Sequence, residues 1–67
     1  MTPDEKRILR VLYVAQKPLS TSKVAVNADM AWLTAKKYLY QLLEMELVNA
    51  GRKGKTVYWW LRVKSTL

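Results

Sequence analysis

The spacing of apolar residues changes once along the chain, from every three or four residues before residue 47 to every second residue after it. The first spacing places side chains on one face of an α-helix, and the second places them on one face of a β-strand. The change predicts a mainly α domain that ends in a small β-hairpin. The expected arrangement is three helices followed by a two- or three-stranded antiparallel sheet.

The first helix has a complete set of start signals. Thr2 can cap the helix, Pro3 suits the first helical position, and Glu5 can return a capping-box hydrogen bond. We expect the helix to run to about Gln16, because the proline that follows Lys17 lacks an amide hydrogen and disfavours helical geometry before it. The predicted core stripe of this helix consists of Ile8, Val11, Leu12 and Ala15.

A short second helix and a tight turn are predicted next. A turn or a very short strand follows the proline, and the polar residues 20–22 are candidate helix caps. The second helix is expected from Lys23 to Asn27. Residues 27–29, Asn-Ala-Asp, are predicted to form the turn, because asparagine and aspartate tolerate left-handed conformations.

The third predicted helix runs from about Ala31 to about Glu46. Its core line is spaced by three or four residues and consists of Ala35, Leu39, Leu42 and Glu46. The opposite side mixes cations with polar-tipped side chains, at Leu33, Lys36, Lys37, Tyr40 and Gln41. This composition suits a recognition surface, but a solvated helix face has the same composition. The residues that follow the helix therefore have to decide between a recognition surface and a solvated helix face.

That segment is predicted to be strand, turn and strand, over residues 47–50, 51–55 and 56–63. The second strand is rich in β-branched and aromatic residues, and the chain's two glycines bracket Arg52 and Lys53 at the expected reversal. By alternation, one face is expected to be buried and carries Val57, Trp59, Leu61 and Val63. The other face carries Tyr58, Trp60, Arg62 and Lys64. The result is a hairpin with a cationic tip.

The composition argues against catalysis. The 67 residues fit a single domain, 1–67, and their formal net charge of +7 attracts polyanions such as nucleic acid or an anionic membrane surface. There is no histidine and no cysteine, and the five acidic residues have predicted structural positions at helix ends or in a turn. We expect a protein that is not an enzyme and that uses no metal or cofactor. The sequence shows neither the features of a signal peptide nor an apolar stretch long enough to span a membrane, so a cytoplasmic location is expected.

Residues 31–48 read Ala-Trp-Leu-Thr-Ala-Lys-Lys-Tyr-Leu-Tyr-Gln-Leu-Leu-Glu-Met-Glu-Leu-Val. Placed between a helix-turn-helix and a basic hairpin, this segment resembles the recognition helix and first wing strand of the winged helix-turn-helix family, in particular its small prokaryotic transcription regulators. The resemblance extends over nearly the whole chain and implies sequence-specific binding to double-stranded DNA. The chain departs from the family pattern at Glu46 and near Ala28, where glycine is usual.

The resemblance and the side-chain chemistry together predict three groups of DNA contacts. In the third helix, which would enter the major groove, the expected contacts are Trp32, Leu33, Thr34, Lys36, Lys37, Tyr40 and Gln41. The hairpin would contact the backbone or the minor groove through Arg52, Lys53 and Lys55. The start of the second helix would clamp a phosphate with Thr21, Ser22 and Lys23.

Two other functions fit parts of the sequence. A winged helix can serve as a protein-interaction module, but the basic third helix and hairpin tip argue against that use. A protein that binds RNA or single strands would use Tyr58 and Trp60 as stacking platforms. This function is the least favoured of the three. Of the three tryptophans, two are expected in the core, and Trp60 is expected to pack or to lie at an interface.

A homodimer is a further expectation. A single recognition helix buries little DNA surface, and two-fold dimers are the usual remedy in this fold class. Leu9, Tyr13 and Val14 lie outside the core stripe of the first helix. They are either a second contact surface or scattered exposed apolar residues, and the second interpretation is favoured.

Overall fold

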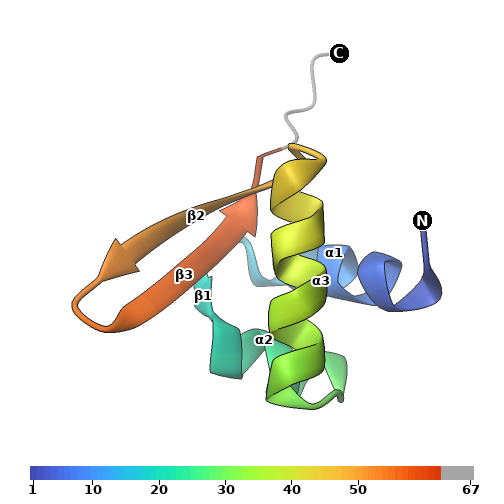
Figure 1. The fold of residues 1–67 in the computed structure, drawn as a ribbon, viewed down its shortest axis with the longest axis horizontal. Helices are drawn as coiled ribbons and strands as arrows, with labels where there is room; N and C mark the ends of the chain where they lie inside the picture. The colour runs from blue at the N-terminus through green and yellow to red at the C-terminus, as the bar shows by residue number, and fades with distance from the viewer. Residues whose placement is uncertain (63–67) are drawn as a thin grey trace.

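Three helices and three strands make up residues 1–62, the part of the chain described by the computed structural model (Figure 1). The elements in chain order are α1 (Pro3–Ala15), β1 (Leu19–Ser20), α2 (Thr21–Ala28), α3 (Trp32–Glu44), β2 (Val48–Lys53) and β3 (Thr56–Leu61). The strands form an antiparallel sheet in the order β1-β3-β2. The predicted fold class is confirmed. The predicted strand positions Val63 and Lys64 lie outside the described residues.

The capping box predicted for α1 is present. The Glu5 amide donates to Thr2 Oγ1 at 3.1 Å, and the Thr2 amide donates to Glu5 Oε1 at 2.9 Å. The helix ends at Ala15, and Gln16 adopts a left-handed conformation as its C-cap. Ile8 and Leu12 are buried, so the core stripe points inward as predicted.

The turn between α2 and α3 begins later than predicted. Ser20 caps α2 by accepting a hydrogen bond from the Lys23 amide at 3.1 Å, and the helix continues through Asn27 and Ala28. Ala28 is only 1% exposed, so its burial in the core extends the helix past the expected end. Asp29 alone supplies the left-handed conformation that ends the helix, with φ 56°.

The prediction for the last turn of α3 was wrong. Ala35, Leu39 and Leu42 are fully buried, as their spacing indicates. Glu46, expected on the same core line, lies beyond the helix with φ 62° and is exposed. It follows the C-cap Met45 and occupies the left-handed region that glycine adopts most easily. This explains why glycine is usual at the position.

The hairpin turn is also shifted from the prediction. Gly51, Arg52 and Lys53 belong to β2, and the reversal is made by residues 54–55, with Gly54 at φ 63°. In the β2–β3 hairpin, Gly51 pairs with Tyr58. The indole ring of Trp60 lies against Gly51. A Cβ at Gly51 would lie 3.0 Å from Trp60 Cη2. The first glycine therefore makes room for a ring, and only the second makes the turn.

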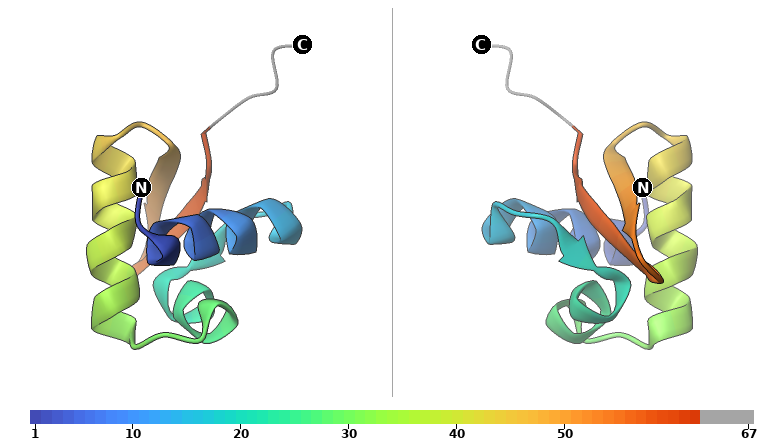
Figure 2. Two further views of the ribbon diagram at one scale, coloured as in Figure 1. Left: turned by 90° about the vertical axis from the view of Figure 1, so that its right-hand side faces the viewer. Right: turned by 90° about the vertical axis from the view of Figure 1, so that its left-hand side faces the viewer.

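Trp59 is at the centre of the core and is completely buried. The cluster around it draws on all three helices and all three strands of residues 1–62, with Ile8, Leu12, Leu19, Val24, Ala28, Leu39, Leu42 and Val48. The expectation of two core tryptophans was wrong, because Trp32 is 46% exposed and Trp60 is only partly buried. The turned views in Figure 2 show α1 and α2 on one side of α3, which leaves its opposite side uncovered.

Candidate nucleic-acid interface

A groove of about 400 Å³ lies between α3, the start of α2 and the hairpin of β2 and β3, which we call the wing. We call this groove the cationic groove. All three predicted groups of site residues contribute to it. Its lining residues are Ser20, Thr21, Ser22, Trp32, Lys36, Tyr40, Arg52, Lys55, Thr56 and Val57.

The charge in this groove is of one sign. Lys36 from α3 and Arg52 and Lys55 from the wing line it, and all three are exposed. Among the described residues that line it, none is acidic. The first turn of α1 holds two of the five acidic residues, the C-cap of α2 holds another, and the remaining two lie at the end of α3 and just beyond it. The cationic groove is therefore a positive concavity, which concentrates the field that attracts an anionic ligand.

Two half-exposed aromatic side chains line the α3 side of the groove. Lys36 Nζ lies 5.1 Å from the centroid of the Trp32 ring, within the range of a cation–π interaction. Tyr40 meets Trp59 edge to face, with ring centroids 5.1 Å apart and an interplanar angle of 88°. Trp32 is 46% exposed and Tyr40 47%. Tyr40 is therefore tied to the core, whereas Trp32 contacts the exposed side chain of Lys36.

The start of α2 contributes a polar end to the groove. Thr21 is 8% exposed, and its Oγ1 accepts a hydrogen bond from Trp59 Nε1 at 2.8 Å. Ser22 is exposed and lines the groove. Lys23 is exposed but outside the lining, and its amide is already bonded to the Ser20 cap.

The remaining predicted residues of α3 are not part of the groove lining. Leu33 is 70% exposed, while Thr34 and Gln41 are partly buried. Lys37 Nζ lies 5.6 Å from the centroid of Tyr38. Since successive residues of an α-helix are about 100° apart, the adjacent lysines face different surroundings. Lys36 faces the wing, and Lys37 lies along another side of the helix.

Three lining residues were not predicted from the sequence. Ser20 was considered only as a cap, and Thr56 and Val57 were considered only as strand residues. Thr56 pairs with Lys53 at the base of the turn, a register that follows once the turn is placed at residues 54–55. Lys53 itself is exposed but outside the lining. A correct position for the hairpin turn was the sequence signal that could have identified the lining residues contributed by the wing.

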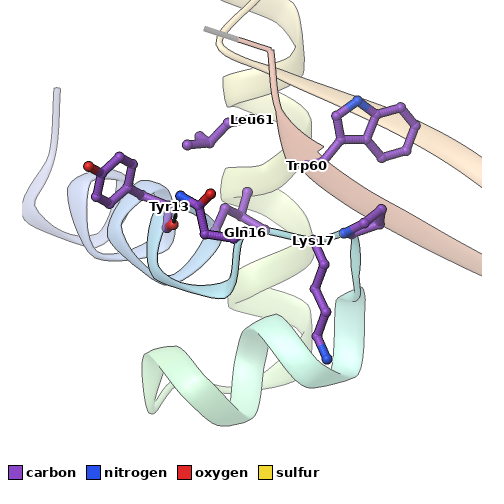
Figure 3. Close-up of a pocket in the computed structure, with 7 residues that line it drawn as sticks. Tyr13, Gln16, Lys17, Trp60 and Leu61 are labelled. Atoms are coloured by element: carbon purple, nitrogen blue, oxygen red, sulfur yellow. Dashed lines mark hydrogen bonds between the residues drawn. The ribbon is translucent and has the colours of Figure 1, made fainter. Parts of the chain in front are cut away.

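A second hollow, which we call the apolar groove, lies between the end of α1 and β3 (Figure 3). It measures about 490 Å³, and its lining residues are Leu12, Tyr13, Gln16, Lys17, Pro18, Trp60 and Leu61. Gln16 Nε2 donates to the Tyr13 carbonyl oxygen at 2.9 Å, which holds one wall in place. Lys17 is the single charged residue among these described lining residues.

A membrane-spanning helix and a metal-binding cluster are both absent from residues 1–62. No helix there is long and apolar enough to cross a membrane. No group of three or more histidine, cysteine, aspartate or glutamate side chains is arranged there to hold a metal ion.

The similarity of the chain to known proteins lies in its fold. No protein-family model and no curated protein sequence matches it. Among solved structures, the homodimeric winged helix-turn-helix DNA-binding domain of Mb0332 from Mycobacterium bovis, a possible ArsR-family transcriptional regulator, has a TM-score of 0.78 and 28% identity. ZitR of Lactococcus lactis, a zinc-responsive MarR family member, has a TM-score of 0.78 and 25% identity, and a ZitR mutant has been solved in complex with DNA. HlyU of Vibrio cholerae has a TM-score of 0.80 and 21% identity.

These similarities cover most of this chain but only part of each neighbour. The matches span 90% of the chain for Mb0332, 91% for ZitR and 92% for HlyU. They span 54%, 43% and 63% of those proteins, respectively. The order of three helices and a wing agrees with these neighbours and with the resemblance seen in the sequence. The chain is a winged helix-turn-helix domain.

Proposed function

We propose that this domain binds double-stranded DNA sequence-specifically as a transcription regulator, with α3 in the major groove and the wing on the backbone or in the minor groove. The observation that carries the proposal is the cationic groove, in which Lys36, Arg52 and Lys55 converge from two elements with no acidic residue in the lining. This role involves no catalysis and no cofactor, and it places the protein with DNA in the cytoplasm.

The proposal divides the contacts between two sides of α3. The side of α3 outside the groove carries two exposed residues, Leu33 and Lys37, and two partly buried ones, Thr34 and Gln41. An α-helix fits a major groove roughly 12 Å wide, where amide, hydroxyl and ammonium groups can bond base edges and an apolar side chain can touch a thymine methyl. These residues are proposed to read sequence.

The cationic groove is proposed to hold the sugar-phosphate strand that separates the two DNA grooves. A helix in the major groove and a wing in the neighbouring minor groove must have that strand between them. Lys36 and Arg52 lie on opposite sides of the cationic groove, and Ser22 adds a hydroxyl at one end. Phosphate contacts of this kind position a protein without reading sequence.

Selection of a preferred duplex from random DNA, followed by binding measurements on two variants, tests this division. Gln41→Ala should relax discrimination at particular base pairs, each of which is worth about 1–3 kcal/mol. Arg52→Ala should weaken binding to preferred and unrelated duplexes by the same factor. Failure to select any preferred duplex, or identical behaviour of the two variants, contradicts the proposal.

We also propose that two copies associate through the apolar groove. The groove has one charged lining residue, Lys17, in a chain of net charge +7, so two copies repel each other less there than at the cationic groove, which has three cations in its lining. Tyr13, 65% exposed, is at its edge, and the neighbouring structure of Mb0332 is homodimeric. None of the residues that line the cationic groove is used, so both α3 helices stay available.

Solution mass tests this association. Tyr13→Glu should shift the protein from dimer to monomer. Val26→Glu makes the same charge change at a residue of α2 that is 74% exposed and outside the apolar groove, and it should leave the mass unchanged. A monomeric unmodified protein, or equal effects of the two substitutions, contradicts the proposed dimer.

A further inference from the structure

The cationic groove combines phosphate-binding charge with accessible aromatic surface. Three cations line it together with two aromatic side chains, each nearly half exposed. Phosphate binding uses the cations and has no need of the rings. A positively charged groove that follows a backbone, with aromatic rings on which bases stack, is the arrangement that binds single-stranded nucleic acid.

We infer that the cationic groove also binds an unpaired nucleotide strand, with a base stacked on Trp32 and phosphates on Lys36, Arg52 and Lys55. The inference rests on the same cations as the proposed duplex binding. It adds a different ligand, a strand whose bases are unpaired and exposed. Such a strand can come from separated DNA or from RNA, because stacking and charge do not depend on the sugar.

Trp32 is the stacking residue because the other aromatic side chains are engaged or outside the groove. The Tyr40 ring packs edge to face against buried Trp59, which fixes its orientation. Tyr58 and Trp60, the platforms considered from the sequence alone, are not part of the groove lining, and the Trp60 ring lies across Gly51. Trp32 touches the flexible side chain of Lys36, which can move aside or remain as a charge near the stacked base.

Trp32 lies at the N-terminal end of α3, where 46% of its surface is exposed. It is the first residue of α3, and the cap before it, Ala31, makes no side-chain hydrogen bond. The groove volume of about 400 Å³ falls in the range of roughly 300–1,000 Å³ that holds small organic ligands. This space suits a short stretch of one strand with its base turned inward.

Fluorescence anisotropy with labelled oligodeoxythymidylate and oligouridylate tests the inference. Trp32→Leu should weaken binding of at least one of these strands about 5- to 150-fold, which corresponds to the roughly 1–3 kcal/mol measured per stacked base. Trp32→Phe keeps an aromatic face and should restore most of the affinity. Tyr58→Leu, the matched control at an aromatic residue that lines neither the cationic groove nor the apolar groove, should leave it unchanged. Circular dichroism checks that each variant is folded.

Intrinsic fluorescence adds a signature specific to stacking. The strand that binds should quench tryptophan emission in the unmodified protein and in Tyr58→Leu, but not in Trp32→Leu. Absence of binding to both strands, or equal losses for the two leucine variants, overturns the inference and leaves duplex binding untouched. A loss of duplex affinity as large as the loss of single-strand affinity in Trp32→Leu also overturns it, because Trp32 then serves the duplex.

Discussion

Replacing Thr21 with valine removes the acceptor for the buried indole N–H of Trp59 while keeping the shape of the side chain. The hydrogen bond is 2.8 Å long, Trp59 is fully buried, and Thr21 is 8% exposed, so water cannot readily replace the lost partner. A buried donor left without a partner costs about 1–3 kcal/mol. That is a large share of the roughly 3–5 kcal/mol expected for a core of this size without cross-links. The variant should be marginally stable.

A double-mutant cycle measured by thermal and urea unfolding isolates this bond. Each kcal/mol should lower Tm by about 4–8 °C in a domain of this length. In a Trp59→Phe background the donor is absent, so Thr21→Val should cost little or even stabilise. Ser22→Ala, at the exposed neighbouring position, is the control and should change stability by less than about 0.5 kcal/mol. An equal cost of Thr21→Val in both backgrounds refutes the reasoning.

Three further substitutions test local features by thermal unfolding. Glu46→Gly should stabilise by about 1 kcal/mol, because relief of the left-handed backbone outweighs the exposed 3.7 Å ion pair with Arg62; a lower Tm contradicts this. Gly51→Ala should destabilise by about 1–3 kcal/mol, since its Cβ would meet the Trp60 ring, and an unchanged Tm would show that the ring moves freely. Thr2→Ala should cost about 1 kcal/mol through the lost cap, and a neutral result would show a frayed helix start.

The sequence was sufficient to predict the elements and their order, because each has a local signal. The capping box at Thr2, the proline after Lys17 and the alternation around Trp59 each have a simple physical meaning. Helix and strand ends were less predictable. Ala28 stays helical because it is buried by tertiary packing, and Glu46 leaves the helix although its spacing continues the core line. Neither effect is visible in local spacing.

The sequence predicted most of the residues that line the cationic groove, but not how they are arranged. The sequence named Lys36 and Lys37 as equivalent, but helical geometry puts only Lys36 in the groove with the wing. Two glycines so close together suggested one turn, whereas Gly51 serves the packing of a ring. Two conflicting expectations for Trp32 came from the sequence, as a DNA contact and as one of two core tryptophans, and its 46% exposure fits the first. Each of these points depends on how segments that are distant in the sequence pack together.

The salt dependence of duplex binding tests the central claim, that the cationic groove holds DNA phosphates. Each phosphate neutralised contributes about −0.9 to the slope of log affinity against log salt concentration. Replacing both Arg52 and Lys55 with alanine should make the slope shallower by about 1.8, twice that contribution. Replacing Lys6 and Arg10, two exposed cations of α1 outside the groove, removes the same charge and should leave the slope nearly unchanged. A slope near zero for the unmodified protein, or equal changes in the two double variants, contradicts the account.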